Sequence, residues 1–136
     1  MSFVLDCSVA LAWVFPDEQN DQVDSLAKRL LTETAVVPSI WPFEIANVLW
    51  VAYRQGRIAK AEIFSIREAL LRLPLEIEPV KIEHILSAVL DVSIQHQLTV
   101  YDSSYLELSS RLSIPLATLD KKLRKAAMSE EIPLLL

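Results

Sequence analysis

Short apolar runs alternate along this chain with longer segments that have the apolar spacing of a helix. The runs at 3–6, 35–38, 75–80 and 114–118 are typical of short strands, and a helical pattern follows each of them. Such alternation predicts parallel strands joined by helices, because a tight turn cannot connect a parallel pair. We therefore expect an α/β protein with a central parallel sheet and helices on both of its faces.

The helical segments are delimited by residues that start or stop a helix. Pro42 lies in a first turn, where its missing N–H costs nothing, and Gly56 ends the same helix. Pro74 stops the next one. Beyond a helical start after Asp6, the expected helices are 23–31, 42–55, 60–73, 82–95, 101–112 and 120–127. The tail 132–136 is a candidate edge strand, so the sheet has four to five short strands.

Length and composition fit a single domain that spans residues 1–136. The chain is 52% apolar and 23% charged, which is the composition of a protein with a core. Its longest unbroken apolar run, 9–15, is far shorter than the roughly 20 residues that span a bilayer, and no basic segment precedes it as in a signal peptide. We expect a cytoplasmic protein with no membrane contact.

Rare residue types exclude several kinds of site. The single glycine, Gly56, excludes a glycine-rich phosphate loop, and the single cysteine, Cys7, excludes an internal disulfide and a cysteine-based zinc site. We expect Cys7 to be a small buried residue. The net charge of −5 argues against binding nucleic acid by bulk electrostatics. That argument weakens if four of the 18 acidic residues bind a metal, because 14 would then stand against 13 basic residues.

Four acidic residues are distinguished by position, because each lies where a helix is expected to start: Asp6, Glu44, Asp102 and Asp120. Taken singly, each is explained as a helix cap or a first-turn acid, which are common roles for Asp and Glu. In a parallel sheet, however, the strand-to-helix turns share one edge, and ligands bind there at the point where the strand order reverses. Four caps would then converge on one cleft.

A cluster of carboxylates must take up protons or bind a cation. Two of them ~4 Å apart repel by about 4 kcal/mol at an effective dielectric of 20. Oxygen-only ligands favour Mg²⁺ or Mn²⁺, and no histidine pair is available, because His84 and His96 are well separated on a different helix. We expect both histidines to have ordinary surface or packing roles.

Four blocks of the sequence resemble, in order, the motifs of PIN-domain nucleases. They are 4–8 (VLDCS), 42–49 (PFEIANVL), 101–108 (YDSSYLEL) and 116–123 (LATLDKKL). The similarity spans nearly the whole chain and is strongest toward the VapC-type toxins of bacterial and archaeal toxin–antitoxin pairs. No block is specific alone, but their order, their gaps and the chain length agree.

The resemblance implies a three-layer α/β/α sandwich and a metal-dependent endoribonuclease whose products end in 5′-phosphate and 3′-hydroxyl. It also implies a cognate antitoxin that inserts a segment into the active-site groove, and a symmetric homodimer. It assigns one catalytic and metal-binding set, for one or two Mg²⁺ or Mn²⁺ ions: Asp6, Glu44, Asp102 and Asp120.

Other residues have two possible roles each. Ser8 and Thr118 match positions where such proteins carry a small hydroxyl that binds a ligand or the substrate, and Asn47 either supports Glu44 or is solvated. Two basic groups are phosphate contacts or solvated faces: Lys121, Lys122, Arg124 and Lys125, and Arg54, Arg57 and Lys60. Two tryptophans, Trp13 and Trp41, pack in the core or line an antitoxin groove or dimer face. Acids that match no motif are expected to be solvated: Asp17, Glu18, Asp21, Asp91 and Glu107.

Two other α/β classes with acidic pockets fit poorly. A receiver domain needs two adjacent acids after its first strand, but here Cys7 follows Asp6. A haloacid-dehalogenase-type phosphatase needs a second Asp two residues after the first, and Ser8 occupies that position. Two alternatives stay open: a catalytically silent PIN domain that binds protein or RNA, and an RNA-processing PIN nuclease without an antitoxin. Stabilisation by Mn²⁺ together with RNA cleavage would distinguish an enzyme from a silent PIN domain. A small reading frame upstream of the gene would distinguish a toxin from an RNA-processing nuclease.

Overall fold

A four-stranded parallel sheet forms the middle layer of the computed structural model, which describes residues 1–136. Its strands are β1 (Ser2–Leu5), β2 (Thr34–Pro38), β3 (Leu75–Glu78) and β4 (Leu116–Ala117), in the order β3-β2-β1-β4. The expected parallel sheet is confirmed, with four of the four to five strands. The tail adds only one bridge, from Leu134 to Leu116, because Pro133 has no N–H to extend the ladder.

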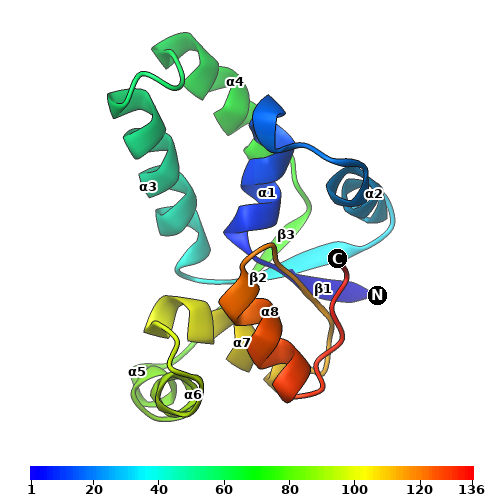
Figure 1. The fold of residues 1–136 in the computed structure, drawn as a ribbon, viewed down its shortest axis with the longest axis vertical. Coiled ribbons are helices and arrows are strands. Elements are labelled where there is room, and N and C mark those ends of the chain that lie inside the picture. Colours follow the sequence, from blue (N-terminus) through cyan, green and yellow to red (C-terminus); the bar gives the residue numbers. More distant parts are fainter.

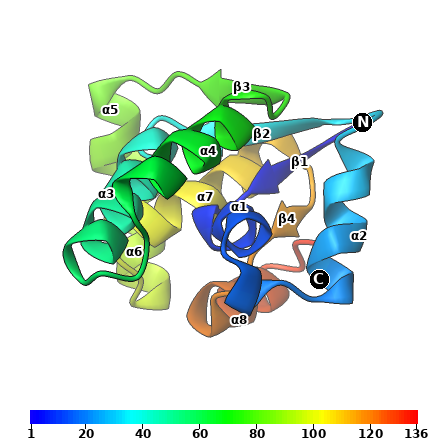
Figure 2. The same cartoon turned by 90° about the horizontal axis from the view of Figure 1, so that it is seen from above.

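Helices cover both faces of the sheet (Figure 1). On one side lie α1 (Cys7–Val14), α2 (Asp21–Arg29), α3 (Trp41–Arg54) and α4 (Lys60–Leu71). On the other lie α5 (Ile82–His84), α6 (Leu90–His96), α7 (Val100–Leu112) and α8 (Lys121–Ser129). Seen from above, α1 lies between α2 and the α3–α4 pair (Figure 2). The three-layer α/β/α architecture is therefore confirmed, and every expected helix is present.

The helices begin and end within two residues of the expected positions, but two turns were not expected. A short 3₁₀ turn, Pro16–Glu18, follows α1, and a π-helical turn, Ile85–Val89, interrupts the expected helix 82–95 between α5 and α6. None of the helices combines the length and apolarity needed to cross a bilayer.

The core surrounds the two central strands. Phe3, Val4 and Leu5 of β1 are fully buried, as is the apolar face of α7, which packs against β1 and β2. In contrast, β3 is an edge strand, as its alternation of apolar and acidic residues predicts. Both Glu76 and Ile77 are exposed, so the apolar Ile77 does not face the core. The apolar runs thus fix which strands lie at the centre.

The strand order reverses between β1 and β4. From β1 the chain adds β2 and then β3 on one side, and it returns to place β4 on the other side of β1. In an open parallel sheet, this reversal at the carboxyl ends of the strands is where ligands bind. Asp6 follows β1 at this point, and Thr118 follows β4.

Candidate active site

The carboxyl ends of β1 and β4 are tied together by backbone hydrogen bonds. The Asp6 amide donates to the Ala117 carbonyl at 3.0 Å, which places the residue after β1 beside the turn 118–120 after β4. The chain after β2 enters α3 at this same edge, and Glu44 lies in the first turn of that helix. The topology thus delivers three of the four expected acids to one edge of the sheet.

Asp6 is buried, with 5% of its surface exposed, and two hydroxyls hold it. Its Oδ2 accepts hydrogen bonds from Ser8 Oγ and Thr118 Oγ1, each at 2.7 Å. Both hydroxyls are oriented in turn, because Ser8 Oγ accepts from the Leu119 amide at 3.0 Å and Thr118 Oγ1 from the Asp120 amide at 3.1 Å. Asp6 precedes α1 but does not cap it with its side chain. The explanation of Asp6 as a helix cap therefore fails.

Asp102 is not a cap either, whereas Asp120 is. The N-cap of α7 is Thr99, whose hydroxyl accepts from the Asp102 amide at 3.1 Å, so the Asp102 carboxylate does not cap this helix. Asp120 Oδ1 accepts from the Leu123 amide at 2.9 Å and so caps α8. Capping thus accounts for Asp120 but not for Asp102.

Glu44 is half-buried and accepts one hydrogen bond, from the Tyr105 hydroxyl to its Oε1 at 2.5 Å. Tyr105 has no exposed surface. Sequence reasoning placed Tyr105 on the buried side of its helix and missed this contact. The available signal was its position one helical turn after Asp102, since a buried tyrosine needs a partner for its hydroxyl.

The acids influence one another electrostatically. Burial raises the pKa of Asp6, and the charge of Asp120 raises it further; burial also raises the pKa of Asp102, with additions from Asp120 and Asp6. Burial raises the pKa of Glu44 too, and Asp6 and Asp102 add to that effect. None of the four acids forms an ion pair within the chain. The edge of the sheet thus concentrates negative charge without a cationic side chain bound to it.

The donor chemistry fits a hard divalent cation. Carboxylate and hydroxyl oxygens surround the site, and these are ligands that Mg²⁺ and Mn²⁺ accept. As positioned here, no group of three or more histidine, cysteine, aspartate or glutamate side chains is arranged to hold one metal ion. The acids lie close enough to affect one another's pKa without being gathered around one point.

Cys7, which follows Asp6, is half-buried and packs against the core. Burial raises the pKa of its thiol, and the carboxylates of Asp6 and Glu44 raise it further. The thiol therefore stays protonated, which agrees with the expectation that Cys7 is not a reactive thiol, although the residue is half-buried and not fully buried.

Comparison with known proteins agrees with this geometry. The model of the PIN domain family matches residues 3–128, a span that includes all four acids. The chain belongs to the PIN domain family. Ribonuclease VapC3 from Pyrobaculum aerophilum is 28% identical over 126 residues, which are 90% of this chain and 92% of that protein.

Solved structures share the fold of this PIN domain. PAE2754 from Pyrobaculum aerophilum has a TM-score of 0.71 and 23% identity, over 93% of this chain and 87% of that one. VapBC2 from Rickettsia felis, bound to a DNA fragment from their promoter, has a TM-score of 0.63 and 17% identity, and the match covers 98% of this chain and 97% of that one. FitAcB from Neisseria gonorrhoeae has a TM-score of 0.64 and 14% identity, and the match covers 97% of this chain and 95% of that one. At these identities the structures confirm the architecture expected of a PIN domain.

The other residues singled out in the sequence of this PIN domain are placed as follows. Asn47 is exposed on α3 and its side chain makes no hydrogen bond within the chain. Trp13 ties α1 to α2, because its Nε1 donates to the Val23 carbonyl at 2.7 Å. Trp41 is buried and lines an apolar groove of about 620 Å³ between α3, α4 and β3, and its Nε1 has no hydrogen-bond partner. Trp13 is thus a packing residue, and Trp41 belongs to the wall of a groove.

The two basic groups are mostly free of ion pairs, and Arg57 is the exception. Arg57 is engaged, because its Nη2 binds the Asp17 and Glu18 carboxylates at 3.0 and 2.6 Å. On α8, Lys121, Lys122 and Lys125 are exposed and form no ion pair, while Arg124 donates to the Thr118 carbonyl at 3.3 Å. The α8 lysines therefore remain available to phosphates, and Arg57 does not.

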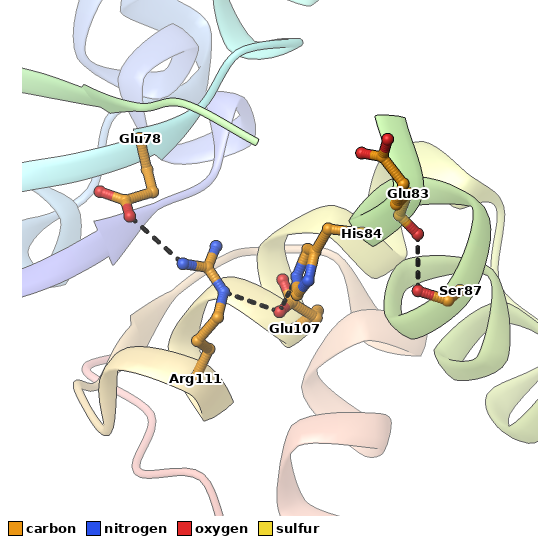
Figure 3. Close-up of polar contacts among 6 residues, drawn as sticks. All are labelled: Glu78, Glu83, His84, Ser87, Glu107 and Arg111. Atoms are coloured by element: carbon orange, nitrogen blue, oxygen red, sulfur yellow. Dashed lines mark hydrogen bonds and ion pairs between the residues drawn. The ribbon is translucent and has the colours of Figure 1, made fainter. Parts of the chain in front are cut away.

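One expected solvated acid is buried in an ion-pair network (Figure 3). Glu107 is 8% exposed, and its Oε1 accepts from Arg111 Nε at 2.8 Å and lies 2.5 Å from His84 Nε2. Arg111 Nη1 also donates to Glu78 Oε1 at 3.2 Å. The prediction for Glu107 is wrong, because Arg111, one turn later on the same helix, and His84 on α5 pair with it and make its burial tolerable. His84 thus has the packing role expected of it.

Proposed function

We propose that this PIN domain, residues 1–136, is a divalent-metal-dependent endoribonuclease and the toxin of a type II toxin–antitoxin pair, acting in the cytoplasm. The observation that carries the proposal is the set of carboxylates at the strand reversal without any cationic partner. Membership of the PIN domain family and the similarity to a protein named Ribonuclease VapC3 support it.

We assign the binding of one or two Mg²⁺ or Mn²⁺ ions to the four acids of the site: Asp6, Glu44, Asp102 and Asp120. Three of them have a pKa raised by burial and by the others, so a cation would relieve a charge cost that the fold has imposed. The chemistry that such an ion supplies when bound is Lewis-acid stabilisation of the phosphate and acidification of water.

The side chains of the site provide no nucleophile of their own. Ser8 Oγ donates to Asp6 Oδ2 and accepts from the Leu119 amide, so we assign this hydroxyl to holding the Asp6 carboxylate in place. Burial and the adjacent carboxylates keep the Cys7 thiol and the Tyr105 hydroxyl protonated, because they raise the pKa of both groups. Hydrolysis by water, without a covalent enzyme intermediate, is the mechanism that this set of residues supports.

Lysines of α8 are the proposed phosphate contacts. Lys122 is close enough to Asp102 that its charge partly offsets the rise that burial causes in the pKa of that carboxyl. Lys121 and Lys125 are exposed on the same helix. These ammonium groups would position the RNA backbone beside the acids, without reading its sequence.

The function is tested by incubating the purified chain with total RNA in Mg²⁺, in Mn²⁺ and in EDTA, and by mapping the new 5′ ends. We expect discrete cuts that carry 5′-phosphate, appear only with the divalent ion and leave 3′-hydroxyl partners. Absence of cuts under all three conditions, together with absence of stabilisation by Mn²⁺, would instead support the catalytically silent alternative.

An antitoxin segment is the proposed occupant of the groove between α3 and α4. Eleven of the 13 residues that line this groove are hydrophobic, and Trp41 and Ile45 in its wall flank Glu44 on α3. Trp50, Leu71 and Ile77 remain largely exposed at the groove, which is typical of a surface that a partner covers.

Leu71→Asp should separate partner binding from catalysis. Leu71 is 74% exposed, so a carboxylate there leaves the fold intact, but it would be buried against the apolar segment of the partner. We expect affinity for the product of the small reading frame upstream of the gene to fall roughly 30-fold, which is about 2 kcal/mol. Leu31→Asp is the control, because Leu31 is 85% exposed and lies outside the groove. Equal affinity of both variants, measured calorimetrically, would refute the placement.

A symmetric homodimer is also proposed. Ile82, Leu86, Leu90 and Ile94 recur every fourth residue from α5 to α6, and all four are exposed. A second copy of the chain would cover this apolar stripe, which is the reason to expect association at this face.

A further inference from the structure

Tyr105 connects two of the proposed ligand-bearing helices. It lies on α7, one helical turn after Asp102, and α7 packs against β1 and β2. Its hydroxyl reaches Glu44 on α3, which belongs to the opposite helical layer and is 61 residues away in the sequence. Tyr105 therefore links the two sides of the sheet at the edge where the acids gather.

The hydrogen bond between these residues has one direction. A phenol hydroxyl has one hydrogen to donate, whereas an ionised carboxylate can only accept. The phenol keeps its hydrogen and donates it, so Glu44 Oε1 is the acceptor. Tyr105 has no exposed surface, and no water competes for this hydroxyl at the protein surface.

Glu44 has one side-chain hydrogen-bond donor, whereas Asp6 has two. Loss of a donor should therefore change the position of Glu44 more than that of Asp6. Asp6 accepts from Ser8 and Thr118, whereas the Glu44 carboxylate accepts only from Tyr105. The like charges of Asp6 and Asp102 disfavour a Glu44 carboxylate that stays close to them. Without a donor on Oε1, a half-buried glutamate would be free to rotate toward solvent.

We infer that Tyr105 is a positioning residue of the metal centre, which holds Glu44 through Oε1 and leaves Oε2 for the cation. This inference rests on the proposed function, because it assigns a supporting group to one of the proposed ligands. Ligating carboxylates are commonly hydrogen-bonded by a neighbouring group, and loss of that group typically weakens metal binding 10- to 100-fold.

Tyr105→Phe removes only the hydroxyl and keeps the buried ring. We expect the dissociation constant for Mn²⁺, measured from free Mn²⁺ by electron paramagnetic resonance, to rise about tenfold. RNA cleavage should fall at limiting Mn²⁺ and recover at saturating Mn²⁺, because Tyr105 acts through the ligand and not on the substrate. Tyr53→Phe on α3 is the matched control, since the Tyr53 hydroxyl has no hydrogen bond in the chain and both properties should stay unchanged.

A double variant separates positioning from general structural support. If Tyr105 acts only through Glu44, Glu44→Gln and Glu44→Gln/Tyr105→Phe should bind Mn²⁺ equally weakly. Two results would overturn the role of Tyr105 while leaving the metal centre in place. One is a further loss of Mn²⁺ affinity in the double variant, and the other is an unchanged Mn²⁺ affinity in Tyr105→Phe when the wild type binds Mn²⁺ and cleaves RNA. A wild type that neither binds Mn²⁺ nor cleaves RNA overturns the metal centre, and the role of Tyr105 with it.

Discussion

Asp6→Asn is expected to reduce metal-dependent RNA cleavage by more than about 100-fold. Loss of a group that only hydrogen-bonds to a metal ligand already lowers metal affinity or activity 10- to 100-fold, so loss of a ligand should cost more. The asparagine carbonyl can still accept from the Ser8 and Thr118 hydroxyls, so the network around the residue survives. What is lost is the charge that a divalent ion needs. The measurement is the initial rate of cleavage with Mn²⁺, alongside circular dichroism to show that the variant is folded.

Asp91→Asn is the matched control for this loss. Asp91 is exposed on α6, and its carboxylate takes part in no hydrogen bond or ion pair. The same change of charge at this position should leave the rate within about twofold of the wild type, as for most surface substitutions. Full activity of purified Asp6→Asn would remove Asp6 from the catalytic set.

The fold could be predicted from the sequence because its signals are local. Runs of apolar residues set the strands, Pro42 and Gly56 set the ends of α3, and the alternation of strands with helices set the parallel sheet. The π-helical turn at Ile85–Val89 has no such signal, because nothing in the spacing of 82–95 departs from an ordinary helix.

Burial of charge was harder to predict because it depends on partners that the fold supplies. Glu107 matched no motif, but it has Arg111 four residues later and His84 brought to it by a different helix. The spacing of Glu107 and Arg111 was visible in the sequence and is the signal that was overlooked. The contact with His84 depends on how α5 packs and could not be inferred from spacing.

The candidate site was predictable in its members but not in their individual surroundings. Topology alone brings Asp6 and Asp120 to the reversal between β1 and β4. Whether an acid caps its helix depends on its neighbours, and here Thr99 takes that role from Asp102 while Asp120 keeps it. The contact of Tyr105 with Glu44 joins opposite layers, so it appears only in three dimensions.

Mn²⁺ is expected to stabilise the folded chain, and the effect should grow with pH. At a hundredfold excess of the ion over its dissociation constant, binding to the folded state alone adds about 2.7 kcal/mol. For a chain of this size, that is a rise in Tm of roughly 10 °C. Protons compete for the same carboxylates, so the rise measured by differential scanning fluorimetry should be larger at pH 7 than at pH 5. Absence of any rise at either pH would contradict a metal centre.

The same carboxylates should destabilise the metal-free protein as pH increases. The folded-state pKa values of Asp6, Glu44 and Asp102 are raised from 3.8, 4.5 and 3.8, so folding favours the protonated forms. The stability that they contribute is fully present below those unfolded values and is lost as pH rises through the raised folded values.

Asp102→Asn isolates this effect in one residue and shows what the charge cluster costs the fold. Burial and the neighbouring acids raise the pKa of its carboxyl, so they outweigh the Thr99 hydroxyl, the charge of Lys122 and the favourable start of α7. We expect the metal-free variant to have a higher Tm than the wild type at pH 7, and the difference to shrink toward pH 4. The variant should also lose most of the stabilisation by Mn²⁺, whereas Asp91→Asn should keep it. A lower Tm of metal-free Asp102→Asn at pH 7 would show that Asp102 supports the fold. A higher Tm fits a residue that is kept for binding a cation, because the fold alone opposes its charge.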